Sequence, residues 1–260
     1  MKHNVIVTLI IVGLFLGAQV MGLVILNKYD GKELPFNLER PEFKEKASSI
    51  SLLISVLIIT ALAFFLIKFQ ARKLWMVWFF LSVFFTLMIA FSVFFDQYIA
   101  LGLAFVLALL KTVKNNVYIH NFTELFIYGG LVAVFAPVLS VSTVFILLIL
   151  ISIYDMIAVW KTKHMVKLAK FQTKMKVFAG LLVPYGKKMA LLGGGDIGFT
   201  LLFAGVVLLS TGWIDALIIV LGVSIALGLL LFLSKKDRFY PAMPYLTVGC
   251  FIGYFIGLLI

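Results

Sequence analysis

The sequence predicts an all-α, polytopic membrane protein with nine transmembrane helices. Its 260 residues are 63% hydrophobic and only 13% charged, whereas charged residues make up about 25% of ordinary soluble domains. A soluble core of this size cannot bury so much apolar surface. The apolar residues gather in runs near the length of about 20 residues that a membrane-spanning helix needs. Because backbone groups in hydrocarbon must be paired within the chain, these runs are expected to be helices.

Nine such runs follow one another in a single transmembrane domain that covers residues 1–260. Six precede a lysine-rich segment and three follow it, with approximate bounds 5–26, 50–67, 74–95, 98–113, 117–136, 138–160, 189–210, 213–233 and 241–260. The first run is longer than the apolar part of a cleavable signal and is therefore expected to be the first helix. In the last run, Gly249, Gly253 and Gly257 recur every fourth residue, which predicts close packing against another helix.

The basic residues gather on one side of the nine predicted helices. The N-terminus and the connections after helices two, four, six and eight hold 17 of the 22 Lys and Arg residues, and the connection after helix one holds the other five. The positive-inside rule then predicts a cytoplasmic N-terminus and a C-terminus outside. The net charge of +11 thus reflects orientation in the membrane, and no nucleic acid partner is expected.

The connection at 161–188 predicts a basic amphipathic segment on the cytoplasmic side. Lysines recur every three or four residues on one helical face, and apolar residues recur on another; these are Lys163, Lys167, Lys170 and Lys174, and Met165, Leu168, Phe171, Met175 and Phe178. Such a helix lies in the membrane interface, and each lysine near anionic headgroups contributes about 1 kcal/mol to binding. A membrane anchor with no other role explains the pattern equally well.

Two aspartates lie inside predicted helices. Asp155 stands six residues before Lys161, and Asp196 stands eight residues after Lys188. At 1.5 Å per residue these are roughly 9 and 12 Å from the basic boundary, so consecutive antiparallel helices bring both carboxylates to a similar depth. A charge near the bilayer centre costs roughly 2.5–3.5 kcal/mol on insertion scales, and the pair is therefore predicted to be functional.

Two close carboxylates in a low dielectric share a proton and titrate as a unit. One can then take a proton from water while the other donates to an amide oxygen, which is the chemistry of aspartic proteases. This chemistry needs no cofactor, and the spacing of His and Cys predicts no metal site. Paired intramembrane acids also mark ion pathways, so a proton- or cation-coupled transporter or channel is the alternative. Glu124, near the start of the fifth run, is a further candidate functional residue.

Glycine and proline motifs accompany the two aspartates. Gly193, Gly194 and Gly195 precede Asp196, and three glycines at roughly 1 kcal/mol each in a helix interior predict a close backbone approach or an opening of the helix. The segment Pro241-Ala242-Met243-Pro244 begins the ninth run. Two prolines leave nearby carbonyls unpaired, so this segment could shape a pocket or hold an extended peptide. A helix start explains Pro241 alone.

Together these motifs resemble those of the presenilin and signal peptide peptidase family, the GxGD intramembrane aspartyl proteases. The resemblance rests on Tyr154-Asp155, Gly193-x-Gly195-Asp196 and Pro241-Ala242-Met243-Pro244, covers essentially the whole chain and is that of a compact, archaeal-like prokaryotic homologue. It implies that Asp155 and Asp196 are catalytic. The substrate-binding residues that it implies are Tyr154, Gly193, Gly194, Gly195, Pro241, Ala242, Met243 and Pro244, of which Gly194 and Met243 stand where the family usually has leucine.

The resemblance further implies a multi-pass cell-membrane enzyme, an intramembrane-cleaving aspartic endopeptidase without cofactor or metal. Its expected partners are transmembrane-helix peptides or proteins and anionic lipid headgroups at the Lys163–Lys174 face, and the sequence is compatible with an oligomer. Prepilin peptidase also has a GxGD motif, but the lysine that follows its aspartate is replaced here by Ile197-Gly198.

Overall fold

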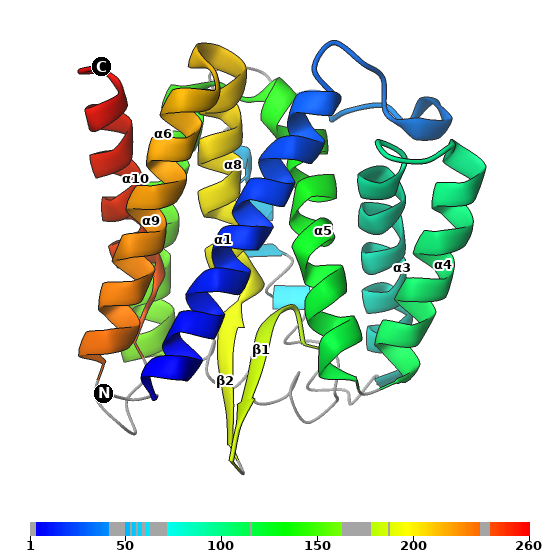
Figure 1. Ribbon diagram of the computed structural model, residues 1–260, viewed down its shortest axis with the longest axis horizontal. Helices are drawn as coiled ribbons and strands as arrows, with labels where there is room; N and C mark the ends of the chain where they lie inside the picture. The colour runs from blue at the N-terminus through cyan, green and yellow to red at the C-terminus, as the bar shows by residue number, and fades with distance from the viewer. Residues whose placement is uncertain are drawn as a thin grey trace.

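The molecule is a bundle of long helices with one β-hairpin at one end (Figure 1). The structure is a computed structural model that describes residues 4–41, 50–52, 54–55, 57–58, 61–62, 72–114, 116–162, 178–186, 188–234 and 240–260. Six of its helices are long and apolar enough to cross a membrane: Val5–Lys28, Lys73–Phe91, Val117–Val138, Val141–Lys161, Gly194–Thr211 and Trp213–Leu233. Gln97–Val113 and Met243–Gly257 are shorter apolar helices, and the described residues between 50 and 62 are also helical. The predicted helical membrane protein is confirmed, while the count of nine and the orientation stay predictions.

Three consecutive helices pack together on one side of the bundle: α3 (Arg72–Phe91), α4 (Gln97–Val113) and α5 (Val117–Phe135). Alanines at every fourth position of α4, Ala100, Ala104 and Ala108, are fully buried. Their small side chains allow the neighbouring backbones to approach closely. The first helix, α1 (Val5–Lys28), crosses the bundle between this group and the rest, and it contacts α5, α8 and α9 (Figure 1).

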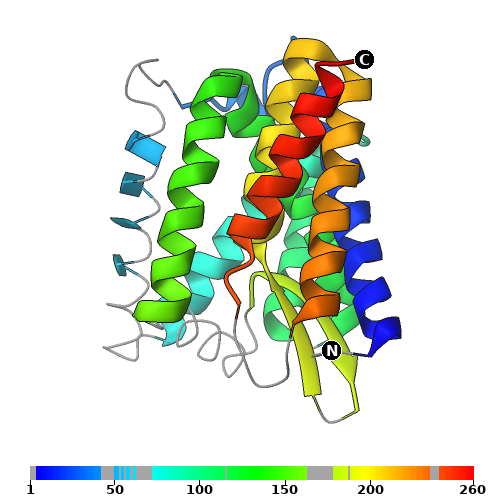
Figure 2. The ribbon, with the colours of Figure 1, turned by 90° about the vertical axis from the view of Figure 1, so that its left-hand side faces the viewer.

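The other side of the bundle holds the helices of the candidate site. They are α6 (Val141–Met156) with its π-helical extension η4 (Ile157–Lys161), α8 (Gly194–Thr211), α9 (Trp213–Leu233) and α10 (Met243–Gly257). The view turned by 90° shows α10 beside α9 along most of its length (Figure 2). A Cβ atom added at Gly253 would lie 2.6 Å from the Cα of Ile219, so the predicted close packing of the last helix is confirmed and its partner is α9.

Residues 180–185 and 188–193 form a β-hairpin, which the sequence did not predict. Strand β1 (Gly180–Tyr185) pairs antiparallel with β2 (Lys188–Gly193), with Gly180 opposite Gly193. The prediction that the seventh helix begins at residue 189 was therefore wrong, as was the amphipathic helical segment in its part from 180 to 188. The Lys163–Lys174 face lies outside the described residues.

Glycine conformations and the burial of apolar side chains both favour the hairpin. Gly180 and Gly186 have φ values of +136° and +56°, and such values favour glycine because it lacks a Cβ atom. Leu181 and Leu192 are buried in the same core as α1 and α8. An apolar run cannot by itself distinguish a buried strand from a buried helix, so the strand β2 was assigned to the helix that follows it.

Candidate active site

Asp155 lies in the last turn of α6, next to the start of α10. Its Oδ2 accepts a hydrogen bond from the backbone N–H of Met243 at 3.1 Å, and the N–H of Ala242 also interacts with its carboxylate. The first N–H groups of a helix have no partner within the helix and point outward from its N-terminus. The start of α10 is therefore a hydrogen-bond donor to Asp155. The wide π-helical turn that directly follows α6 is a feature often found at functional sites.

A second hydrogen bond holds α6 against α10 close to Asp155. The hydroxyls of Ser152 and Thr247 are 2.8 Å apart, and both residues are buried. Ser152 stands one turn before Asp155, and Thr247 stands one turn after Met243. This bond therefore stabilises the approach of the two helices at the point where the Met243 N–H reaches the carboxylate.

Asp196 lies in the first turn of α8, three residues after the N-cap residue Gly193. Its carboxylate interacts with the backbone N–H of Gly193, which is the geometry of a capping box, in which the third helical residue reaches back to the N-cap. A Cβ atom at Gly193 would lie 3.2 Å from Oδ2 of Asp196. The glycines thus stand at the beginning of the helix, and the expectation that they weaken a helix interior was wrong, because β2 occupies the residues that precede them.

Gly194 is the most closely packed of the three glycines. Its N–H donates to the carbonyl of Ala179 at 3.0 Å, and an added Cβ atom would lie 2.8 Å from the hydroxyl of Tyr128. The sequence prediction of a close backbone approach is confirmed at this position. Larger residues at this position would collide with α5 unless Tyr128 moved.

The fold brings the two aspartates together. Helices α6 and α8 pack against each other, and the carboxylates are near enough for their charges to interact. Gly193, Ala242 and Met243 contact them through backbone N–H groups. Four other predicted site residues adjoin these along the chain: Tyr154 in α6, Gly195 in the first turn of α8, Pro241 before α10, and Pro244 within the first turn of α10. Since α10 begins at Met243, the prediction that Pro241 starts the helix was wrong.

Gln19 in α1 stabilises the start of α8, a role that was not predicted from the sequence. The residue is fully buried, and its amide nitrogen donates to the carbonyl of Ile197 at 3.1 Å and to the hydroxyl of Thr200 at 2.8 Å. The Thr200 hydroxyl in turn lies 2.8 Å from the carbonyl oxygen of Asp196. A lone glutamine inside the apolar run 5–26 is the signal that could have identified it, because buried polar groups need partners.

The outer edge of β2 leads directly to Asp196. On β1, the backbone N–H and C=O of Leu182 both bond to the side chain of Asn121 on α5, at 3.0 and 2.7 Å. The backbone N–H and C=O of Leu182 therefore point away from β2. Leu191, its register partner, points its own N–H and C=O to the opposite side, because these groups diverge in a non-hydrogen-bonded antiparallel pair. Within the described part of the chain, no backbone group pairs with this edge. We call Met189 and Leu191 the open edge of β2.

No metal centre accompanies the aspartates in the part of the chain that the structure describes, where no group of three His, Cys, Asp or Glu residues could hold an ion. The groups that the structure places at this site are the two carboxylates and the N–H groups directed at them.

The chain matches known proteins in sequence and in fold. A family model described as signal-peptide peptidase, presenilin aspartyl protease matches residues 12–196. No curated protein sequence matches the chain. Among solved structures, a presenilin family intramembrane aspartate protease in the C222 space group is 18% identical, with a TM-score of 0.71 over 96% of this chain and 97% of that chain. A presenilin family intramembrane aspartate protease in the P2 space group is 19% identical, with a TM-score of 0.68 over 96% of each chain.

Proposed function

Because the chain belongs to the signal-peptide peptidase and presenilin aspartyl protease family, we propose that it is a GxGD-type endopeptidase that hydrolyses peptide bonds of transmembrane helices. The observation that carries this proposal is that α6 and α8 pack against each other with Asp155 and Asp196 near enough for their charges to interact. The transporter or channel interpretation finds no support in the family or in the matching folds.

The proposed mechanism uses one shared proton. The ionised carboxylate takes a proton from water while the water oxygen bonds to the scissile carbonyl carbon, and the protonated carboxyl gives its proton to the carbonyl oxygen. The tetrahedral diol then collapses: the carbon–nitrogen bond breaks, the nitrogen receives a proton, and a carboxylic acid and an amine leave. The N–H groups of Met243 and Gly193 hold the two carboxyls in place during both steps.

The substrate is an unwound stretch of a membrane helix. A peptide bond inside a helix is protected by its hydrogen bonds, so the segment must become extended before water can attack. The open edge of β2 offers N–H and C=O groups in the spacing that an added strand requires, and β2 itself ends at Gly193, three residues before Asp196. Tyr154, Gly195, Pro241 and Pro244 adjoin the same place and are proposed to line the substrate site.

The proposed location is the cell membrane, with the hairpin end of the bundle facing the cytoplasm. This orientation rests on the distribution of Lys and Arg. It places the two carboxylates in the cytoplasmic half of the bilayer.

The test is cleavage of a defined membrane peptide by the purified protein in detergent and in liposomes. Asp155→Asn and Asp196→Asn keep the size of each side chain but cannot share the proton, so each variant should lose cleavage, as judged by mass spectrometry of the products, while unfolding at a temperature near that of the wild type. A hydroxyl-containing transition-state mimic should inhibit the wild type. Substantial cleavage by either variant, or ion flux in liposomes without any peptide product, would contradict the proposal.

A further inference from the structure

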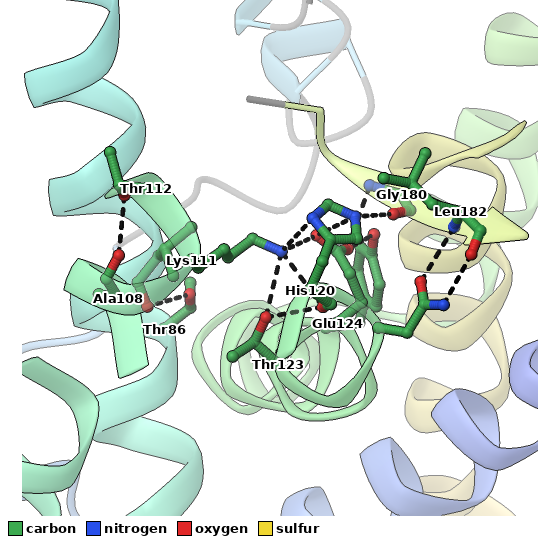
Figure 3. Close-up of polar contacts among 12 residues, drawn as sticks. Thr86, Ala108, Lys111, Thr112, His120, Thr123, Glu124, Gly180 and Leu182 are labelled. Carbon is green, nitrogen blue, oxygen red and sulfur yellow. Dashed lines mark hydrogen bonds and ion pairs between the residues drawn. The ribbon is translucent and has the colours of Figure 1, made fainter. Parts of the chain in front are cut away.

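A buried ionic network lies beside the candidate site and takes no part in the mechanism above. The Nζ of Lys111 on α4 reaches across to α5 and donates to Oε1 of Glu124 at 2.7 Å, to the hydroxyl of Thr123 at 3.1 Å, and to the carbonyl of His120 at 3.4 Å (Figure 3). It also lies 3.2 Å from Nδ1 of His120. The side chains of Lys111 and Glu124 are 0% and 2% exposed. Such a pair is costly to bury, and removing one partner is far worse than keeping both.

The network continues from α5 into the base of the hairpin. Oε2 of Glu124 accepts the N–H of Gly180 at 3.1 Å, and Nε2 of His120 lies 2.7 Å from the Gly180 carbonyl oxygen. Both backbone groups of Gly180 are thereby held by α5 (Figure 3). Oε2 of Glu124 also accepts the hydroxyl of Tyr128. One carboxylate therefore joins α4, α5 and the first residue of β1.

These contacts end at the glycines that precede Asp196. Gly180 is the register partner of Gly193, which is the N-cap residue whose N–H interacts with the Asp196 carboxylate. Tyr128, held by Glu124, packs against Gly194. Glu124 is thus connected to Asp196 in two ways. One is through Gly180 and its register partner Gly193, and the other is through the Tyr128 hydroxyl, which packs against Gly194.

We propose that Glu124 is a positioning residue: it holds the hairpin base and the glycine turn so that Asp196 faces Asp155, and Lys111 supplies the charge that makes a buried carboxylate tolerable there. The inference rests on the proposed function. A carboxylate suits this role because Oε1 and Oε2 together accept three donors: the Gly180 N–H, the Tyr128 hydroxyl and the Lys111 ammonium.

Glu124→Gln is therefore a sharp perturbation although it changes little volume. If the amide oxygen faces Gly180, the amide NH2 faces the Lys111 ammonium; if the oxygen faces Lys111, the NH2 faces the Gly180 N–H. In either orientation the amide NH2 faces another hydrogen-bond donor, so one hydrogen bond is lost and two donors are brought together. Combining it with Lys111→Met removes the ammonium, so that the amide oxygen can accept from Gly180 and Tyr128 without opposing charge.

The experiment measures kcat, KM and the unfolding temperature for cleavage of a membrane peptide in detergent. We expect Glu124→Gln to lower kcat about 100-fold with KM little changed, since a misplacement of about 1 Å at a reacting group costs that much. The double variant with Lys111→Met should recover about tenfold or more of this loss. Thr112→Val is the matched control on α4, because among the described residues the Thr112 hydroxyl bonds only to the Ala108 carbonyl of its own helix. This variant should behave as wild type.

The outcomes separate the possible causes. A folded Glu124→Gln variant with wild-type kcat would overturn the positioning role, and so would a double variant no more active than the single one, because a group that itself moves protons is not rescued by removing its counter-charge. If Glu124→Gln does not fold, Tyr128→Phe tests the same claim, since it deletes one donor and should lower kcat by a smaller factor; unchanged kcat would again overturn it. A wild-type protein without any cleavage would instead defeat the proposed function.

Discussion

Replacement of Gly253 by alanine tests whether the contact between α9 and α10 sets the geometry of the site. The added Cβ atom would lie 2.6 Å from the Cα of Ile219 and 2.9 Å from the carbonyl oxygen of Ile218. Both are backbone atoms of a helix and cannot rotate away. Ordinary van der Waals contact begins at 3.4 Å, so the two helices must separate by about 0.8 Å, the difference between 3.4 and 2.6 Å.

The energetic cost follows from two opposing terms. Overpacking of a well-packed interface costs about 1–3 kcal/mol, while alanine in place of glycine favours a helix by about 0.8–1.0 kcal/mol. The net loss is about 0–2 kcal/mol. Gly13→Ala is the matched control, because no atom of the described chain lies within 4 Å of its added Cβ, so only the favourable term remains. The two variants should therefore differ by about 1–3 kcal/mol in free energy of unfolding.

Thermal unfolding of both variants in one detergent, with peptide cleavage measured in parallel, provides the assay. Gly253→Ala should unfold at a lower temperature than Gly13→Ala. It should also cleave more slowly, because α10 carries the Met243 N–H that lies 3.1 Å from Asp155 and a displacement of about 0.8 Å is enough to break this bond. If Gly253→Ala unfolded at or above the temperature of Gly13→Ala, the argument from backbone contact would be refuted.

Three further changes test the open edge of β2, the α6–α10 contact and the C-terminal end of α1. Leu191→Pro removes an N–H from the open edge of β2 and should abolish cleavage while Leu191→Ala retains it; equal activity of the two would contradict strand addition. Thr247→Val deletes the bond to Ser152 and should cost about 0.6 kcal/mol, the average for such bonds in membranes, with a few-fold slower cleavage; unchanged unfolding and cleavage would refute its role. Burial raises the pKa of Tyr29 to about 12 from 10, so the unfolded chain loses this proton first and wild-type stability should fall between pH 10 and 12. Tyr29→Phe should lessen that fall in stability. If wild type and Tyr29→Phe lost stability equally between pH 10 and 12, the prediction would be wrong.

Much of the fold and the position of the two aspartates could be predicted because both depend on local features. Hydrophobic runs of sufficient length must become helices in hydrocarbon, and α9 was predicted at 213–233, the bounds it has. The predicted depth of Asp196 assumed a helix from Lys188, whereas residues 188–193 are the strand β2; the structure nevertheless places Asp196 near enough to Asp155 for their charges to interact. That they act on a substrate stays a prediction of the family and the chemistry.

Other features depend on contacts between residues far apart in the chain, and no local sequence pattern predicts them. The hairpin exists because α5 takes up the outward backbone groups of Gly180 and Leu182. The run that contains β2 is as apolar as a helix, so hydrophobicity could not identify it. Likewise, the sequence indicated only that a charged Glu124 lies near the start of a predicted helix. Its partners Lys111 and Gly180 were not predicted.

The sequence by itself determined that this chain is a helical membrane protein, which residues carry its acid pair, and which family it belongs to. Only the tertiary structure decided that the Met243 N–H is directed at Asp155, that Asp196 caps its own helix after a strand, and that Lys111 and Glu124 meet beside the glycines. The physical reason is that hydrophobic length and charge are properties of segments, whereas hydrogen bonds between helices depend on where each segment ends and which face it turns to its neighbour.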